Sequence, residues 1–375
     1  MQPPATRRIV VHVPSLRGGG AERVCVIVAN EMARRRHDVT LFVWDGKGPN
    51  AALVSPTVKI LDLGLTARGE NFGKIATLKA LLRSVAIYRR LRPDAVFSAL
   101  EFANLMTALA LIIGGGSSKF FPSFHAAASL KADSLGSRLA PLLSRLVSFR
   151  ATRALAVSHG IGRELAARGF SNERIEVINN PIPSLLHDET RSHEFEHRLA
   201  RMGSGPVIVT LGRLVEVKDH RTLISAFAML DPARQCRLVI FGEGPLKEAL
   251  RQQAETLGVE DRVLLAGYIN DPAACYAVAD LFVLSSMSEG FGNVLVEAMG
   301  AGVPVVSTEA PHGPREILAD GKFGALVPVG DATALAKAMQ ASLDQPADLS
   351  ILHKRASEFS EQVIGERYER LLDLS

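Results

Sequence analysis

The sequence predicts an α/β protein built from two doubly wound, mostly parallel sheets. Its 375 residues, 47% apolar and 22% charged, are ample for globular cores and more than most single cores hold. Short runs rich in β-branched residues alternate with helical segments, which is typical of parallel sheets. The alternation stops near residue 180 and restarts near residue 207, so we expect two domains of the same kind.

The elements follow in order along the chain. Strands of the first domain are predicted at Ile9–Val13, Val39–Trp44, Ala95–Ser98, Phe120–Phe124, Ala154–Val157 and Ile175–Ile178. Asn180-Pro181-Ile-Pro183 then forces extended backbone, and a polar stretch runs to Pro206. Strands of the second domain are predicted at Val207–Leu211, Arg237–Phe241, Val263–Ala266, Leu281–Leu284 and Val305–Ser307. We assign residues 1–183 to the first domain, 184–204 to a linker, 205–356 to the second domain and 357–375 to an amphipathic C-terminal helix.

The strand–loop–helix–strand pattern at residues 281–307 is the most informative part of the sequence. Its loop joins the carboxyl end of a strand to the amino end of a helix, where helix N–H groups favour phosphates. Glu289 and Glu297 lie eight residues apart across this junction. Carboxylates would repel phosphates, so these two are suited to accept hydrogen bonds from neutral hydroxyls. A ligand that carries both phosphates and hydroxyls is indicated, and a sugar nucleotide has both.

This segment, Glu289-Gly290-Phe291-Gly292 with Glu297, resembles the Glu-x7-Glu motif of retaining glycosyltransferases of the GT-B fold, family 4 type (glycosyl transferases group 1). Further matching segments occur in the same order: Gly19-Gly20-Ala21-Glu22-Arg23, Phe124-His125, Val157-Ser158, Asn180-Pro181, Gly212-Arg213-Leu214-Val215, Gly242-Glu243-Gly244-Pro245 and Gly313-Pro314-Arg315-Glu316. The resemblance implies two Rossmann-like domains that face each other across a cleft, with the C-terminal helix crossing back to the first domain. The first domain would be on the acceptor side, and the second would bind the nucleotide sugar.

Two cations are candidates for stabilising a departing diphosphate. The sequence contains no Asp-x-Asp pair of the kind that recruits a divalent metal in many transferases. Arg213 and Lys218 follow the predicted strand Val207–Leu211, where Arg can bind phosphate as a fork and Lys as a point charge. An ordinary surface Arg and Lys on a loop is the alternative. With the resemblance, we expect them to neutralise the diphosphate without metal or another cofactor.

The resemblance also implies roles for other residues. His125 would contact the donor sugar across the cleft, Glu289 would lie beside the transferred sugar, and Glu297 would bind the ribose hydroxyls. Further donor contacts are expected from Gly19, Gly20, Gly242, Glu243, Gly244, Pro245, Tyr268, Gly290, Phe291, Gly292, Asn293 and Val294. Structural alternatives stay open: a core histidine at His125, tight turns at the glycines and an exposed helix residue at Glu297.

Charge is unevenly distributed along the chain. Residues 1–180 contain 25 Lys and Arg against 12 Asp and Glu, whereas the remainder contains 18 against 27. Basic and apolar residues share helical spacing in 79–92 and 138–150, a pattern typical of helices that lie on anionic lipid. A solvated helix face packed on a sheet is the alternative. Nucleic-acid binding is disfavoured because base-stacking aromatics are not interleaved with the basic residues.

Location follows from three further features. The apolar stretch at Ile9–Val13 is too short for a signal peptide, and Leu105–Ile113 is shorter than the roughly 18–20 residues of a membrane span and predicts a buried helix. Cys25, Cys236 and Cys275 form no C-x-x-C pair and are expected to be reduced, buried thiols. These features favour a cytoplasmic protein, with peripheral contact to the cytoplasmic face of the inner membrane through its basic first domain.

Two further motif matches have simpler explanations. His193-Glu194-Phe195-Glu196-His197 fits the zinc protease pattern, but it lies in the polar linker. Ser158 sits on a strand-to-helix turn like a hydrolase nucleophile, but a helix N-cap is the simpler explanation.

The expected activity is therefore retaining, metal-independent transfer of a sugar from a nucleoside diphosphate sugar, with UDP as the expected nucleoside diphosphate. The acceptor would be lipid-linked or an envelope polysaccharide. The segment Pro311–Leu318 resembles one found in transferases that use N-acetylhexosamines; a hexose is the other candidate. A UDP-sugar 2-epimerase of similar architecture and a non-catalytic glycosyltransferase-like subunit remain alternatives.

Overall fold

A computed structural model of the chain describes residues 6–65, 73–125, 135–183, 199–269, 272–345 and 348–374. The chain divides into two compact units. The first unit comprises Met1–Pro181 and Glu361–Ser375, and the second comprises Ile182–Ser360. The last residues of the chain therefore belong with the first ones, not with their neighbours in sequence.

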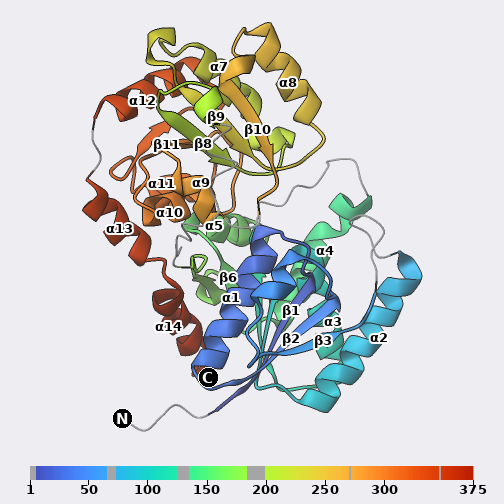
Figure 1. Cartoon of the computed structure of the whole chain (residues 1–375). Coiled ribbons are helices and arrows are strands. Elements are labelled where there is room, and N and C mark those ends of the chain that lie inside the picture. Colours follow the sequence, from blue (N-terminus) through green and yellow to red (C-terminus); the bar gives the residue numbers. More distant parts are fainter. Residues whose placement is uncertain are drawn as a thin grey trace. The chain divides into compact units, whose positions relative to one another are not determined.

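The described part of the first unit contains a seven-stranded parallel sheet in the order β3-β2-β1-β4-β5-β6-β7 (Figure 1). Its strands are β1 (Arg8–Ser15), β2 (Asp38–Asp45), β3 (Lys59–Asp62), β4 (Ala95–Ala99), β5 (Lys119–Phe124), β6 (Ala154–Ala156) and β7 (Ile175–Val177). The helices are α1 (Gly20–Arg34), α2 (Lys74–Leu91), α3 (Glu101–Gly114), α4 (Leu135–Arg150), α5 (His159–Ala167) and α14 (Glu361–Leu372). Strand order reverses between β1 and β4, which places a crevice for ligands at their carboxyl ends.

The C-terminal helix α14 is part of the first unit's core. Ile364, Tyr368, Leu371 and Leu372 are buried in the same apolar cluster as the inward face of α1. The Tyr368 ring lies edge-on to Phe97 with 5.4 Å between centroids. Figure 1 shows α14 beside α1. Burying four large side chains from the far end of the chain stabilises this unit by several kcal/mol, since each contributes about 1.5–3 kcal/mol.

The second unit, over its described residues, contains a six-stranded parallel sheet in the order β10-β9-β8-β11-β12-β13. Its strands are β8 (Val207–Leu211), β9 (Arg237–Phe241), β10 (Val263–Gly267), β11 (Leu281–Leu284), β12 (Val305–Thr308) and β13 (Ala325–Val327). The helices are α7 (His220–Ala228), α8 (Lys247–Thr256), α9 (Ala273–Ala277), α10 (Asn293–Gly300), α11 (Gly313–Ile317), α12 (Ala332–Asp344) and α13 (Leu349–Ser357). Strand order reverses between β8 and β11.

Every strand predicted from the sequence is present, with ends that differ by a residue or two. The sequence analysis missed two strands, β3 and β13, which lie at the edges of the two sheets. Lys59–Asp62 reads KILD and has no buried side chain, so it carries no apolar run to signal a strand. Ala325–Val327 is only three residues long. Both are held by backbone pairing to one neighbour, which side-chain patterns do not report.

The helical predictions for the basic and apolar segments are also confirmed. Residues 79–92 and 138–150 fall largely within α2 and α4, and the apolar segment around 105–113 lies within α3. Its inner side is buried, whereas Ile113 at the end of α3 is 51% exposed. None of the helices that the structure describes is long and apolar enough to cross a membrane. All three cysteines are buried and form no disulfide, and burial raises the pKa of Cys25 to about 12.

Candidate functional site

The strongest cluster of predicted site residues lies at the carboxyl edge of the second sheet. Arg213 and Lys218 follow β8, and Glu289 follows β11. These strands are neighbours, and the strand order reverses between them. In open α/β sheets, ligands bind at such a reversal, because the loops diverge there and leave a crevice.

Lys218 and Glu289 are in direct contact across this reversal. Lys218 Nζ lies 2.5 Å from Glu289 Oε1, and their side chains are 22% and 12% exposed. Ser286 Oγ donates to the same carboxylate oxygen at 2.6 Å. The Glu289 carboxylate is held by Lys218 and Ser286, and the side chains of the Lys218–Glu289 pair remain partly exposed to solvent.

Backbone contacts hold the loops after β8 and β11 together. Met287 N donates to Val217 O at 2.8 Å, and Ser285 Oγ donates to Lys218 O at 2.9 Å. Thr308 Oγ1, at the end of β12, donates to Ser286 O at 2.6 Å. The position of the Lys218 side chain is therefore fixed by three strands rather than by its own loop alone.

Arg213 belongs to a second part of this edge. Its side chain is exposed and has no ion pair within the described residues. Its loop is clamped to the turn after β9, because Gly212 N donates to Phe241 O at 2.9 Å and Leu214 N donates to Glu243 O at 2.9 Å. The guanidinium is thus directed to solvent from a rigid backbone.

Gly242 is required for this clamp. Its φ is +139°, and a Cβ there would lie 1.9 Å from Gly212 O. The turn Gly242–Pro245 therefore packs directly against the loop that carries Arg213. Gly242 N also donates to Gly267 O at 2.8 Å, which brings in the end of β10 and the 58% exposed Tyr268. The structure places Tyr268 and the turn Gly242–Pro245, both predicted to contact the donor, together along one sheet edge.

The start of α10 supplies the rest of the predicted donor site. Gly292, with φ +104°, precedes the first helical residue, Asn293, and Val294 follows in the first turn. Phe291 is 2% exposed and packs edge-on against Phe359 at 5.4 Å. Phe291 is therefore anchored in the core, and its neighbours Gly290 and Gly292 are buried with it.

Glu297 lies inside this part of the molecule. It is 5% exposed, and Tyr276 OH donates to its Oε2 at 2.9 Å. The alternative of an exposed helix residue is wrong. Burial of a carboxylate is costly unless hydrogen bonds compensate, and Tyr276 supplies one such bond.

Sequence reasoning missed Ser286 and Tyr276, which donate to the two carboxylates, and Thr308, which donates to the backbone of Ser286. The only signal for Ser286 was its place in the polar turn three residues before Glu289. Tyr276 lies on α9, and nothing in its sequence neighbourhood connects it with Glu297. It also missed His220, which is 2% exposed below the loop after β8. Burial lowers the pKa of His220 to about 4, an effect that the backbone of Arg213 partly opposes.

The first unit holds the remaining predicted residues at the carboxyl edge of its own sheet. Gly19 and Gly20 follow β1 and are exposed. Gly19 caps α1, and its N–H donates to Glu22 Oε2 at 2.9 Å. Ser15 Oγ donates to the other oxygen of the Glu22 carboxylate. The Glu22 carboxylate therefore joins the backbone of Gly19 to the side chain of Ser15, while Gly19 and Gly20 remain exposed.

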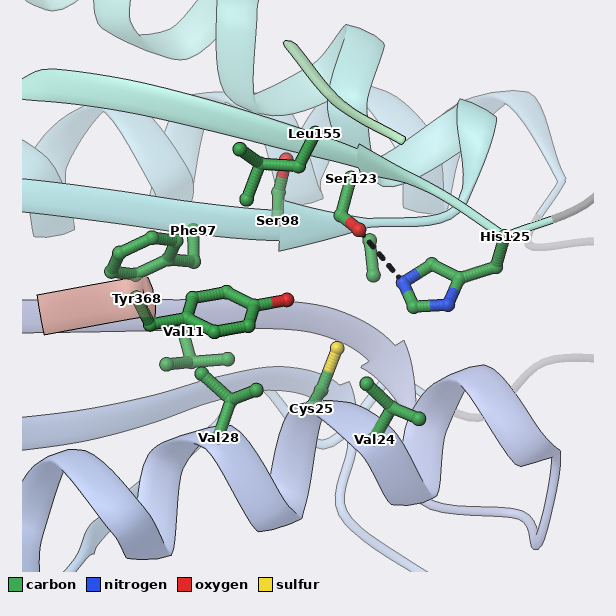
Figure 2. Close-up of a pocket in the computed structure, with 11 residues that line it drawn as sticks. Val11, Val24, Cys25, Val28, Phe97, Ser98, Ser123, His125, Leu155 and Tyr368 are labelled. Carbon is green, nitrogen blue, oxygen red and sulfur yellow. Dashed lines mark hydrogen bonds between the residues drawn. The ribbon is translucent and has the colours of Figure 1, made fainter. Parts of the chain in front are cut away.

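His125 directly follows β5 (Lys119–Phe124) at the same edge. Ser123 Oγ lies 2.9 Å from His125 Nε2, as Figure 2 shows. The two residues line a cavity of about 10 Å³ with Tyr368, whose hydroxyl points toward Ser123 and Cys25. That volume holds about one water molecule. Burial lowers the pKa of His125 to about 4, so the imidazole is neutral near pH 7.

The structure tests only one of the two further motif matches, the turn at Ser158. The zinc-like segment His193–His197 lies outside the described residues. Ser158 is the N-cap of α5, and its Oγ accepts a hydrogen bond from Ile161 N at 3.2 Å, which confirms the capping interpretation. Among the residues that the structure describes, no group of three or more His, Cys, Asp or Glu side chains could hold a metal ion.

Comparison with solved structures identifies the fold. The fold matches Anabaena Alr3699/HepE, solved with UDP and glucose, with a TM-score of 0.82 and 24% identity over 98% of this chain and 100% of that one. It also matches sucrose-phosphate synthase from Thermosynechococcus elongatus, with a TM-score of 0.78 and 19% identity over 97% of this chain and 98% of that one. The protein has the GT-B glycosyltransferase fold.

Family models narrow the class. The model for Glycosyl transferases group 1 matches residues 175–363, and the model for Glycosyltransferase Family 4 matches residues 18–184. The chain therefore belongs to the family 4, group 1 glycosyltransferases, as the sequence motifs indicated. A lipopolysaccharide core biosynthesis glycosyltransferase of Rhizobium meliloti, LpsE, is 29% identical over 374 residues, which covers 97% of this chain and 98% of the relative.

A second relative is similar over most of its length. The N-acetylgalactosamine-N,N'-diacetylbacillosaminyl-diphospho-undecaprenol 4-alpha-N-acetylgalactosaminyltransferase of Campylobacter jejuni is 27% identical over 350 residues. The match covers 90% of each chain.

Proposed function

We propose that this glycosyltransferase is retaining and metal-independent, and that it moves a hexose or N-acetylhexosamine from a UDP-sugar to a lipid-linked or envelope polysaccharide acceptor. One observation carries the proposal: Lys218 and Glu289 meet at 2.5 Å where the strand order of the second sheet reverses. This arrangement puts a cation for phosphate and a carboxylate for sugar hydroxyls side by side.

The cations are proposed to stabilise the leaving diphosphate. An ammonium has three donors, so Lys218 can donate to Glu289 and to a phosphate oxygen together. The exposed guanidinium of Arg213, on the clamped loop after β8, can bind phosphate as a fork. Their charge would substitute for a divalent metal as negative charge develops on the leaving oxygen.

The sugar would be oriented by groups that carry no positive charge. Glu289 accepts hydrogen bonds from sugar hydroxyls, and neutral His125 can donate or accept one. The bond from the anomeric carbon to the diphosphate oxygen breaks, and the nucleoside diphosphate leaves with the bonding electrons. A bond to the acceptor oxygen forms on the same face, and the proton of the acceptor hydroxyl passes to the leaving diphosphate oxygen. We propose no covalent glycosyl-enzyme intermediate.

The related proteins support the choice of donor and acceptor. Alr3699/HepE has been solved with UDP and with UDP-glucose. The names of the relatives from Rhizobium and Campylobacter refer to lipopolysaccharide core and to a diphospho-undecaprenol acceptor. An acceptor of this kind lies at a membrane surface, so the enzyme would work in the cytoplasm in peripheral contact with the inner leaflet.

The test is transfer from UDP-glucose, UDP-N-acetylglucosamine and UDP-N-acetylgalactosamine to a polyprenyl diphosphate-linked acceptor in the presence of EDTA. We expect a product with the donor's anomeric configuration, read by NMR. An inverted product would refute retention, and activity that disappears with EDTA and returns with Mg²⁺ or Mn²⁺ would refute metal independence. Conversion of the donor sugar without acceptor would favour the epimerase. If no UDP compound raises the melting temperature or serves as donor, the UDP assignment is wrong.

A further inference from the structure

Helix α2 exposes apolar side chains in a regular pattern. Ile75, Leu78 and Leu82 are 75%, 57% and 61% exposed. Their spacing of three and four residues puts them on one side of the helix. The opposite side, with Ala80, Val85 and Tyr88, is buried. The helix is therefore apolar on two sides, and only one of them is used by the fold.

Positive charges flank the exposed residues. Lys79 and Arg83 are exposed next to Leu78 and Leu82, and the 18 residues of α2 contain no Asp or Glu. We call Ile75, Leu78, Lys79, Leu82 and Arg83 the α2 stripe. Apolar groups flanked by cations match a bilayer interface, where acyl chains lie below anionic head groups.

The position of the stripe relates it to the predicted acceptor-side loops. The chain leaves α2 at the amino ends of β1 and β4, since Asp94 N donates to Arg8 O at 2.8 Å. The helix therefore begins at the opposite, carboxyl edge of the sheet, and the stripe occupies this first part. Gly19, Gly20 and His125 lie at that same edge of the first unit.

A neighbouring helix adds to the same surface. Phe102, at the start of α3, is 41% exposed and lies edge-on to Trp44 at 5.4 Å. Helices α2 and α3 pack side by side, as Figure 1 shows. Because α3 follows directly on β4, its first turn is also at the carboxyl edge. Exposed apolar groups thus continue from α2 toward the loops of that edge.

We propose that the α2 stripe binds the surface of an anionic bilayer, with its apolar side chains among the lipid head groups. This contact would bring the carboxyl edge of the first sheet to the surface where a lipid-linked acceptor presents its sugar. The inference builds on the proposed function, since it names where the acceptor is met. It does not depend on catalysis, because lipid binding is measured without a donor.

The test is cosedimentation of the full chain with sucrose-loaded vesicles of phosphatidylcholine alone or mixed with phosphatidylglycerol. We expect binding to the mixed vesicles that weakens with salt. The variant Leu78→Ser/Leu82→Ser should bind about 10–100-fold more weakly, since two apolar side chains no longer enter the interface. Leu349→Ser/Ile351→Ser on α13, where the parent residues are 47% and 44% exposed, is the matched control and should bind like the parent.

Charge is tested separately. Lys79→Glu/Arg83→Glu should weaken binding by about 30-fold or more, from roughly fivefold for each cation lost. Lys337→Glu/Lys354→Glu changes the net charge equally at exposed positions of the second unit and should have a smaller effect. Equal losses of vesicle binding in the two charge variants would show that only net charge matters and would overturn the proposal that the α2 stripe binds the bilayer.

Other outcomes identify a different role for the stripe. Unchanged vesicle binding by the Leu78→Ser/Leu82→Ser variant overturns the proposal. So does light scattering that shows a dimeric parent and a monomeric variant without vesicle binding by either, because the stripe would then join two copies of the chain. If the parent chain binds the vesicles but transfers no sugar, the proposed catalytic function is contradicted and the lipid contact remains supported.

Discussion

Replacement of Lys218 by Ala tests the central electrostatic argument. It removes the ammonium that lies 2.5 Å from Glu289 and that we propose binds the diphosphate. Loss of one preorganised positive group at a leaving oxygen costs about 10²–10³ in kcat, or about 2.7–4 kcal/mol. Folding stability should change less. With side chains 22% and 12% exposed, the pair lies between surface and buried ion pairs, so we expect a loss of about 1–2 kcal/mol.

A double-mutant cycle separates the two effects. Lys218→Ala, Glu289→Gln and the combined variant are compared by urea unfolding and by kcat/KM for transfer. In stability, the two changes should couple by about 1–2 kcal/mol, because Gln needs no ammonium partner. In activity, the combined variant should remain at least as impaired as Lys218→Ala, because the cation is required by the diphosphate and not only by Glu289.

Lys337→Ala is the control, since Lys337 is exposed on α12 away from the sheet edge that carries the site. It should leave both measurements unchanged. Near-normal kcat/KM in Lys218→Ala would refute the proposed role of this cation. Recovery of activity when Glu289→Gln is added would show that Lys218 acts only by pairing.

Three further predictions concern single features. Ser286→Ala removes the hydroxyl that holds the paired carboxylate and should lower kcat/KM by about 10–100-fold, from about 1.5–3 kcal/mol for a hydrogen bond to a charged group; an unchanged rate would show that the carboxylate needs no such support. Gly242→Ala should lose more than about 2 kcal/mol of stability and most UDP affinity in calorimetry, because its Cβ would overlap a backbone oxygen. Gly258→Ala, also at positive φ but facing open space, should cost about 1 kcal/mol and keep UDP binding, and equal effects would contradict the steric argument. Burial lowers the pKa of His12 to about 3 and of His125 to about 4, so the unfolded chain binds more protons below pH 6.5 and stability should fall from pH 7 to pH 5 in urea titrations. A flat profile would show that these histidines are accessible to protons in the folded state.

The order of strands and helices was largely predictable, because buried parallel strands are continuous apolar runs and turn residues separate them. This holds for Val207–Leu211 and Leu281–Leu284, which are central and match their predicted ends. It fails for β3, whose side chains are exposed although its backbone is paired. Pattern reading detects burial of side chains, and an edge strand can form with little of it.

The sequence by itself identified the residues whose chemical type and position after a strand suit a sugar nucleotide, including Arg213, Lys218, Glu289 and Glu297. It also indicated the family, because those residues lie in segments that match the family's motifs in the same order along the chain. Only the tertiary structure showed that Lys218 contacts Glu289 and that Tyr276 holds Glu297. Residue type and local spacing are encoded within a few turns of the chain. Contacts between residues 71 or more positions apart, as for Lys218 and Glu289, depend on which strands become neighbours, and that is decided by packing of the whole sheet.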